Sequence, residues 1–266
     1  MVAKRKERLD VMLVERGLVE SRSKAQALIM AGEVMVNGQR VDKAGTRLAD
    51  DVKINVKEQP PFVSRGGEKL AWALETFAID VSDLVAADVG ASTGGFTDCL
   101  LQNGISRVYA IDVGYGQLAH KLRIDERVVV IERTNARYVD SLDEPIDLCV
   151  IDASFISLRL ILPQVVKWLK STGQVVALIK PQFEAGKSQV GKGGVVKDQG
   201  VHEAILTDIL TFSQETGFHV AGLTTSPIKG LKEGNTEFLV WLRTEVIESE
   251  NDIAKMVQDV LSVNNS

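Results

Sequence analysis

Four charged residues each follow a short apolar run, and side chains of these types could together transfer a group to a hydroxyl. Asp88, Asp112 and Asp152 end three of the runs, and Lys180 ends a fourth. Ligands of open α/β sheets bind at the carboxyl ends of the strands, so we expect the four side chains to line one site. A lysine in such a site could orient or deprotonate a hydroxyl, or stabilise charge that develops on its oxygen.

The turn after Asp88 is a candidate cofactor cradle, because glycines permit a sharp bend and a close approach of the backbone to a ligand. Residues 88–98 read DVGASTGGFTD. This is not the G-x-G-x-x-G spacing that seats a dinucleotide pyrophosphate. It suits a ligand with a nucleoside and an amino acid but no phosphate, which describes S-adenosylmethionine, although an ordinary strand–helix turn is the alternative. To this cofactor we assign Asp88, Gly90, Ala91, Ser92, Thr93, Gly94, Gly95, Phe96 and the strand-end residue Asp152.

Two further segments are candidates for the nucleoside of this cofactor. Asp112 lies about 20 residues after the glycine turn, where a ribose-binding carboxylate is expected. Its alternative role is to cap the next helix. Asn135 follows the apolar run 128–131, and its amide could hydrogen-bond an adenine edge. We therefore add Asp112, Asn135 and Ala136 to the predicted cofactor site.

The elements that must position these residues alternate along the chain. We expect strands at 84–88, 107–112, 128–131, 147–152 and 174–180, a closing pair at 219–225 and 236–242, and helices at 155–170, bent by Pro163, and 201–216. Such alternation predicts a Rossmann-like α/β fold with a parallel sheet covered on both faces. Residues 181–200 form a long loop typical of a lid, and Pro181 excludes a phosphate-binding loop there. A short helix follows residue 247.

The first 58 residues differ from the rest in charge and pattern. Residues 1–60 hold 12 basic and 9 acidic residues, whereas the whole chain has a net charge of −5. A basic segment on an acidic protein suggests an anionic partner. We expect helices at 8–16 and 21–30 and strands at 34–38 and 52–56. We place this α+β domain at 1–58, a proline-stiffened linker at 59–65 and the second domain at 66–266.

The N-terminal motifs resemble the S4 RNA-binding domain over nearly its whole length. They are R-L-D-x-x-L from Arg8, S-R-S-x-A-x-x-x-I-x-x-G from Ser21, and V-x-V-N-G from Val34. The resemblance implies binding to RNA phosphates, which supply affinity and register but little sequence information. Each cation could equally belong to a solvated helix face. The predicted RNA-binding residues are Arg8, Arg22, Lys24, Asn37 and Arg65.

The second domain resembles the FtsJ-like ribose 2′-O-methyltransferases, and with the S4 unit the whole chain resembles the TlyA family, often labelled hemolysin A. The stretches that carry the resemblance are SRGGEK (64–69), the glycine turn, DASFIS (152–157), IKPQF (179–183) and GNTEF (234–238). The resemblance implies a catalytic Lys-Asp-Lys-Glu set and methylation of cytidine riboses in ribosomal RNA. The set corresponds here to Lys69, Asp152, Lys180 and Glu237.

The required chemistry fits this set. A ribose hydroxyl is a weak nucleophile that must be held in line with the methyl group and lose its proton. We expect Lys180 to act on that hydroxyl, either as the base that removes its proton or as the group that stabilises the alkoxide. A lysine amine in water has a pKa of about 10.4, so a base role requires a lower value.

Several other classes are disfavoured. Cys99 and Cys149 lie in apolar runs, as expected of reduced core cysteines in a cytoplasmic protein, and the three histidines lack metal-ligand spacing, so we predict no metal. No apolar run is long enough to span a membrane, so any hemolysis would be indirect. Residues 152–155 lack the prolines of an amine methyltransferase. A non-catalytic RNA-binding protein bound to ribosomes is the remaining alternative, and oligomeric state stays undetermined.

Overall fold

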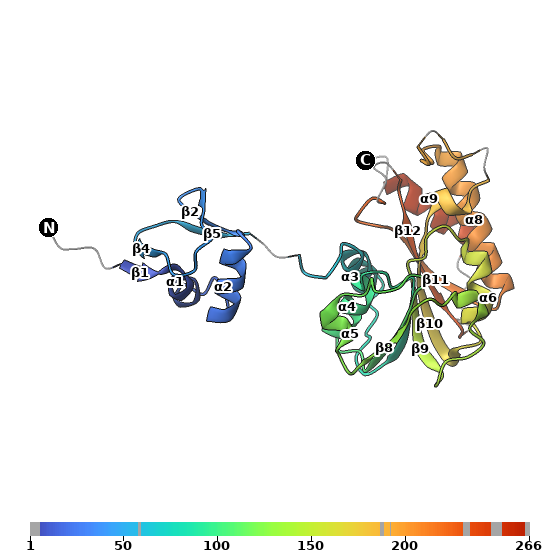
Figure 1. The fold of residues 1–266 in the computed structure, drawn as a ribbon. Helices are drawn as coiled ribbons and strands as arrows, with labels where there is room; N and C mark the ends of the chain where they lie inside the picture. The colour runs from blue at the N-terminus through green and yellow to red at the C-terminus, as the bar shows by residue number, and fades with distance from the viewer. Residues whose placement is uncertain are drawn as a thin grey trace. The chain divides into compact units, whose positions relative to one another are not determined.

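The structure is a computed structural model, and it describes residues 6–57, 60–186, 189–191, 193–230, 235–245 and 252–263. The chain divides into two compact units, Met1–Gln59 and Pro60–Ser266. Figure 1 shows the two units, each with its own helices and strands.

The N-terminal unit packs two helices against short strands. Its elements are β1 (Lys6–Arg8), α1 (Leu9–Glu15), α2 (Arg22–Met30), β2 (Val34–Val36), β3 (Gln39–Arg40), β4 (Arg47–Ala49) and β5 (Ile54–Val56). Strands β3, β2 and β5 form one antiparallel sheet, and β1 pairs with β4. Both expected helices are present. The sequence did not predict β1, β3 or β4, because runs of two or three residues carry too little periodicity to be recognised.

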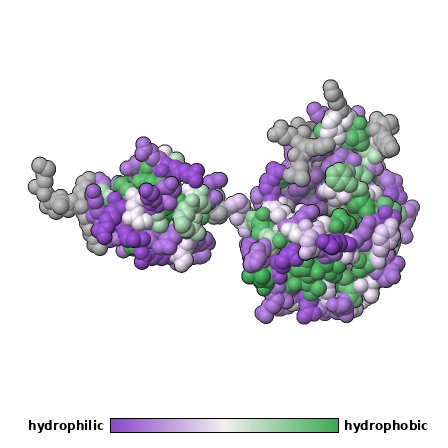
Figure 2. All heavy atoms as spheres, in the orientation of Figure 1, coloured by the Kyte–Doolittle hydropathy of each residue, from purple (hydrophilic) through white to green (hydrophobic). Residues whose placement is uncertain are grey.

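Local sequence explains the boundaries in this unit. Ser21 caps α2 by accepting a hydrogen bond from the Lys24 amide at 3.3 Å. Asn37 and Gly38 have positive φ angles of 51° and 81°, as a tight hairpin turn between β2 and β3 requires. Leu9, Leu13 and Ile29 are fully buried in a core of the unit's own. The face of this unit drawn in Figure 2 is mostly hydrophilic, with a few hydrophobic residues.

The second unit contains a seven-stranded sheet in the order β11-β12-β10-β9-β6-β7-β8. Its strands are β6 (Val85–Val89), β7 (Arg107–Ile111), β8 (Val128–Ile131), β9 (Ile146–Ile151), β10 (Leu169–Ile179), β11 (His219–Thr225) and β12 (Phe238–Arg243). Strands β6 to β10 run parallel, and β12 is antiparallel to both β10 and β11. The predicted Rossmann-like α/β class and its closing antiparallel strand pair are confirmed.

Helices cover both faces of this sheet (Figure 1). Side chains alternate between faces along a strand, and here the neighbours Val150 and Ile151 belong to opposite hydrophobic clusters, as do Leu178 and Ile179. Because all four are buried, both faces must be covered, which explains the continuous apolar runs in the sequence. One face packs α3 (Gly66–Thr76), α4 (Gly95–Gln102) and α5 (His120–Arg123), and the other packs α6 (Leu162–Val165), α8 (Gln199–Glu215) and α9 (Ile253–Val263).

The predicted helix at 155–170 is wrong. That segment forms a 3-10 turn, η2 (Leu158–Leu160), the one-turn helix α6, and the start of β10 at Leu169. Pro163 lies at the start of α6, where its missing N–H group has no helical partner to lose, so it does not bend a longer helix. The apolar spacing that suggested a helix comes from Ile161, Leu162 and Trp168, which are buried against the core.

The segments around the predicted linker and lid also carry structure. Residues 60–65 are a bent segment attached to the second unit, in which Val63 N–H donates to Asp98 at 2.8 Å. The first residue of the expected linker, Gln59, lies outside the described residues, as does Glu58, the last residue of the expected N-terminal domain. The expected lid begins as a short helix, α7 (Pro181–Glu184), and positions 187, 188 and 192 of that loop are outside the described part, as is Gly234. Helix α9 is the helix expected after residue 247.

Candidate active site

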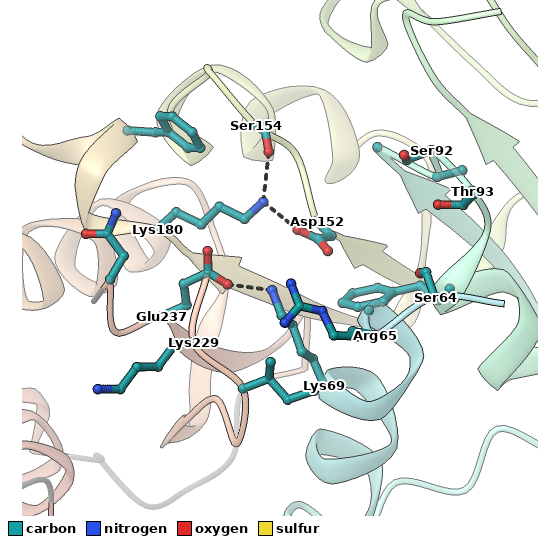
Figure 3. Close-up of a pocket in the computed structure, with 18 of the residues that line it drawn as sticks. Ser64, Arg65, Lys69, Ser92, Thr93, Asp152, Ser154, Lys180, Lys229 and Glu237 are labelled. Atoms are coloured by element: carbon teal, nitrogen blue, oxygen red, sulfur yellow. Dashed lines mark hydrogen bonds and ion pairs between the residues drawn. The ribbon is translucent and has the colours of Figure 1, made fainter. Parts of the chain in front are cut away.

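A cavity of about 460 Å³ opens at the carboxyl edge of β6, β9 and β10 (Figure 3). It collects side chains from the glycine turn, from α3, from the loops after β9 and β10, and from the segment before β12. The predicted site residues that line it are Arg65, Lys69, Asp88, Gly90, Ala91, Ser92, Thr93, Gly95, Phe96, Asp152, Lys180 and Glu237. All four residues of the predicted catalytic set therefore lie on one cavity wall.

Lys180 has two partners on this wall. Its Nζ lies 2.5 Å from Asp152 Oδ1 and donates to Ser154 Oγ at 3.0 Å. The topology explains the meeting, because β9 and β10 are neighbouring parallel strands in which Ala177 pairs with Ile151. Lys180 and Asp152 follow the ends of these two strands. Figure 3 shows the Lys180 side chain extended toward Asp152 and Ser154.

Lys69 and Glu237 form the second ion pair, with Nζ 2.5 Å from Oε2. Their side chains are 11% and 3% exposed, so the pair is largely removed from water. Glu237 immediately precedes β12, whose Phe238 pairs with Ile179 of β10, and this register sets Glu237 beside the strand end that carries Lys180. Lys69 lies near the start of α3, where the helix dipole disfavours a cation, and the buried carboxylate of Glu237 compensates.

Asp88 is fully buried at the end of β6 and belongs to the cavity wall. Its Oδ2 accepts hydrogen bonds from the Thr97 amide at 3.0 Å and the Thr97 hydroxyl at 2.6 Å. Its Oδ1 has no hydrogen-bond partner among the described residues. Burial raises the pKa of Asp88 to about 7, and the nearby charge of Asp152 adds to the rise while the Thr97 hydrogen bonds oppose it. A carboxylate left in this state suits a cationic ligand group.

The glycines of the turn serve close backbone packing. At Gly90, which has a φ of 85°, an added Cβ would lie 2.8 Å from the carbonyl oxygen of Asp152. At Gly95 it would lie 2.2 Å from Ser64 Oγ. We expected the glycines to make room for a ligand, whereas at these two positions the structure shows that they make room for other loops of the site.

Four of the predicted cofactor residues do not line the main cavity. At Gly94, an added Cβ would meet Leu122. Asp112 accepts hydrogen bonds from the amides of Ser92 at 2.8 Å and Gly114 at 2.6 Å, and lines a smaller hollow beside the turn. The side chain of Asn135 caps the 3-10 turn η1 (Ala136–Tyr138) by accepting from the Arg137 amide. Ala136 is buried in the core. An adenine contact by Asn135 would require another orientation of this amide.

The predicted RNA-binding residues of the N-terminal unit have protein partners. Arg8 and Arg22 both bond to Asp10, whose side chain is fully buried, at 2.9 and 3.0 Å. These hydrogen bonds hold the pKa of Asp10 far below its usual range. Lys24 pairs with Glu20, which precedes α2, and the Asn37 side chain accepts from the Lys53 amide. Arg22 and Lys24 remain about half exposed, so their outer surface is still open to a phosphate.

Several cavity residues had not been assigned a role from the sequence. They include Ser64, Ser154, Phe155, Gln182, Phe183, Lys229 and Asn235. Most of them lie in the stretches that carried the family resemblance, so the signal was present, but sequence alone does not show which neighbour of a key residue faces the cavity. Lys229 lay outside every motif.

Two kinds of feature, a metal-binding cluster and a membrane-spanning helix, are absent from the described residues. These residues hold no cluster of three or more histidine, cysteine or acidic side chains arranged to bind a metal ion. Among the same residues, no helix has the length and apolar character needed to cross a membrane.

Comparison with known proteins identifies relatives across the whole chain. The FtsJ-like methyltransferase family model matches residues 62–244, and the S4 domain model matches residues 7–54. YqxC of Bacillus subtilis, described as a candidate rRNA methyltransferase, is 53% identical over 90% of this chain and 86% of its own. The 16S/23S rRNA (cytidine-2′-O)-methyltransferase TlyA of Mycobacterium tuberculosis is 46% identical over 91% of each chain.

Solved structures agree. A Streptococcus thermophilus protein described as a candidate hemolysin superposes with a TM-score of 0.74 at 45% identity, covering 99% of this chain and 97% of that one. A Listeria monocytogenes protein described as a candidate S-adenosylmethionine-dependent methyltransferase shares only 14% identity at a TM-score of 0.51, and so supports the fold alone.

Proposed function

This chain belongs to the TlyA family of FtsJ-like methyltransferases, and on that premise we propose that it methylates the ribose 2′-hydroxyl of cytidine in ribosomal RNA with S-adenosylmethionine as methyl donor. The observation that carries the proposal is the joining of Lys69, Asp152, Lys180 and Glu237 into two ion pairs on the wall of one cavity. A binding protein that had lost catalysis would have no reason to keep all four.

The residues present fit the cofactor. When bound, S-adenosylmethionine supplies an electrophilic methyl group on a sulfonium centre. The cavity volume of about 460 Å³ is within the range of small-molecule sites. We assign the unpartnered Oδ1 of Asp88 to the ammonium group of the amino-acid moiety, because a buried carboxylate is stabilised by a cation. Asp112 and the backbone of Ser92 and Thr93 remain our assignment for the ribose side.

Lys180 is the residue that we assign to the acceptor hydroxyl. Within the described residues its ammonium donates one N–H to Ser154 and forms an ion pair with Asp152, so a further N–H is available to a substrate oxygen. In this role Lys180 holds the hydroxyl in line and stabilises the charge that grows on its oxygen. The proton that the hydroxyl loses passes to the carboxylate of Asp152, which lies beside Lys180 Nζ and lines the same cavity.

We assign to the Lys69–Glu237 pair the role of shaping the part of the cavity that receives the substrate ribose. Glu237 is held by Lys69 at 2.5 Å and also contacts the Gln182 amide at 3.5 Å. A carboxylate fixed in this way can accept a hydrogen bond from a neighbouring hydroxyl of the substrate ribose and so orient the sugar.

The RNA-binding role is divided between the two units in this proposal. The S4 unit supplies affinity through exposed cations such as Arg22 and Lys24. At the cavity wall of the second unit, the exposed side chains of Arg65 and Lys229 could contact phosphates that flank the target nucleotide. A ribosomal RNA substrate is met in the cytoplasm, which is where we expect the protein to act.

The test is methyl-label transfer to ribosomal subunits, followed by digestion to nucleosides. The proposal predicts labelled 2′-O-methylcytidine with the wild-type protein. A label on the base, or RNA binding without any transfer, would contradict it, and the second result would favour the non-catalytic alternative.

A further inference from the structure

Two loops of the site are joined by hydrogen bonds and by a contact between aromatic rings. Glu184, the last residue of α7, accepts a hydrogen bond from the Ser157 hydroxyl at 2.5 Å and another from the Leu158 amide at 2.9 Å. Phe183, which precedes Glu184, and Phe155 both line the cavity, and their rings pack with centroids 4.9 Å apart. These contacts connect the loop that carries Asp152 to the helix that follows Lys180.

The carboxylate of Glu184 is built into this junction. Burial raises its pKa, while the hydrogen bonds from Ser157 and Leu158 and the charge of Arg159 oppose the rise, and Asp208 adds to it. A carboxylate that is partly removed from water costs free energy unless it is hydrogen-bonded, and here each oxygen has one donor. Glu184 is not among the residues that line the cavity, so its contacts serve the loops and leave it away from the substrate.

Lys180 depends on this junction for its position. It immediately precedes α7, and its carbonyl accepts from the Phe183 amide at 2.8 Å. Helix α7 has only four residues, far below the roughly 12 to 15 at which a helix becomes even marginally stable alone. Tertiary contacts must therefore hold α7 in place. Glu184 supplies two of them through its hydrogen bonds to Ser157 and Leu158.

We propose that Glu184 is a positioning residue for methyl transfer, and that its hydrogen bonds to Ser157 and Leu158 fix the distance between Lys180 and the Asp152–Ser154 loop. The inference rests on the proposed function and deepens it. It gives Glu184, which does not line the cavity, a role in positioning the catalytic groups. A displacement of such groups by about 1 Å can lower a rate on the order of 100-fold.

A set of three variants tests the inference. Glu184→Ala removes both hydrogen bonds. Glu184→Gln keeps them, because its amide oxygen can accept from Leu158 and its amino group can donate to the Ser157 hydroxyl. Asp208→Asn is the matched control, since it weakens the ion pair between Asp208 and Arg159 and keeps both hydrogen bonds of Glu184 in place.

The first readout is the single-turnover methylation rate at saturating RNA and cofactor. We expect Glu184→Ala to lower this rate on the order of 100-fold with dissociation constants for RNA and cofactor close to wild type. Glu184→Gln and Asp208→Asn should keep the wild-type rate. If Glu184→Ala does not fold, Ser157→Ala removes one of the two hydrogen bonds and should give a smaller loss of the same kind.

The second readout does not require methyl transfer. The rate at which an amine-acylating reagent labels Lys180, followed by mass spectrometry, reports how firmly this 6% exposed side chain is held. Glu184→Ala should speed the labelling and Glu184→Gln should not. Wild-type rates of both methylation and labelling in folded Glu184→Ala would overturn the inference, as would equal losses in the alanine and glutamine variants. A wild-type protein that methylates nothing, with labelling as expected, would instead overturn the proposed function.

Discussion

Lys69 and Glu237 are 168 positions apart in the sequence, and their side chains meet with Nζ 2.5 Å from Oε2 in a largely buried pair. The contact fastens the first turns of α3, which follow the bent segment 60–65, to the residue before β12. Both residues line the cavity.

Variants of this ion pair should separate its effect on the free energy of unfolding from its effect on methylation. Glu237→Leu leaves the Lys69 ammonium buried without its partner, which should lower the free energy of unfolding by about 3 to 5 kcal/mol. The double variant Lys69→Met/Glu237→Leu removes both charges and should recover most of that loss, yet methylate no RNA. Urea unfolding and the methylation assay together measure the two effects. Additive losses of stability in the double variant would show that the pair is not coupled as the structure indicates.

The raised pKa of Asp88 predicts that the stability of the cofactor-free protein depends on pH. Its folded pKa of about 7 lies above the ordinary value of 3.8, so the fold favours the neutral acid. As the pH rises between these two values, Asp88 ionises in the unfolded chain while the fold keeps it protonated, so the free energy of unfolding falls, and the fall is complete above about pH 7. Asp88→Asn has no such ionisation, so its stability relative to wild type should increase from about pH 5 to about pH 8. Urea denaturation across this range measures the difference, and a constant difference would be evidence against the raised pKa.

Gly90 tests the packing of the glycine turn. Gly90→Ala places a Cβ against the Asp152 carbonyl and should displace the carboxylate that pairs with Lys180. Gly217 is the matched control, because it also has a positive φ, of 99°, but faces open space at the end of α8. Both alanine variants carry left-handed backbone strain of about 1 to 2 kcal/mol. Only Gly90→Ala should also weaken cofactor binding in calorimetry, and equal affinities in the two variants would contradict the assignment.

The sequence predicted the strand ends of the sheet well for a physical reason. Both faces of the parallel strands are buried, so each strand reads as an apolar run, and the first polar residue after it lies at the ligand-binding edge. That reasoning placed Asp88, Asp112, Asp152 and Lys180 at one site. Asp88, Asp152 and Lys180 do line one cavity, whereas Asp112 lines a smaller hollow beside the glycine turn.

Other features depend on three-dimensional contacts that no local pattern records. The pairing of Lys180 with Asp152 follows from the order of β9 and β10 in the sheet, and the burial of Ile161 and Trp168 imitates helical spacing where little helix forms. The role of Arg8 as a partner of buried Asp10 was also hidden, since an arginine in an RNA-binding motif looks the same in sequence whether or not it supports the fold.

The hydrogen bonds to buried Asp10 predict that acid lowers the stability of the N-terminal unit. The hydrogen bonds from Arg8, Gln26 and Arg22 hold its folded pKa below the ordinary value of 3.8, so its contribution to stability is present above that value and is lost as the pH falls below it. The unit has its own core, so a fragment of residues 1–59 can be studied alone. Wild-type stability should fall on acidification through about pH 4, whereas Asp10→Asn should start lower and fall less. Parallel curves from chemical denaturation would exclude this role.

The measurement that tests the account most directly is the single-turnover rate of ribose methylation by wild type and Lys180→Ala, with the methyl groups mapped on ribosomal RNA by mass spectrometry. The account predicts a rate lower by about 100-fold or more in Lys180→Ala, with cofactor and RNA affinities nearly unchanged because both ligands have many other contacts. Lys180→Arg should not restore the rate, since a planar guanidinium cannot replace the ammonium at this position. A Lys180→Ala variant that methylates the same ribose at the wild-type rate would show that Lys180 only supports the fold, and the proposed mechanism would be wrong.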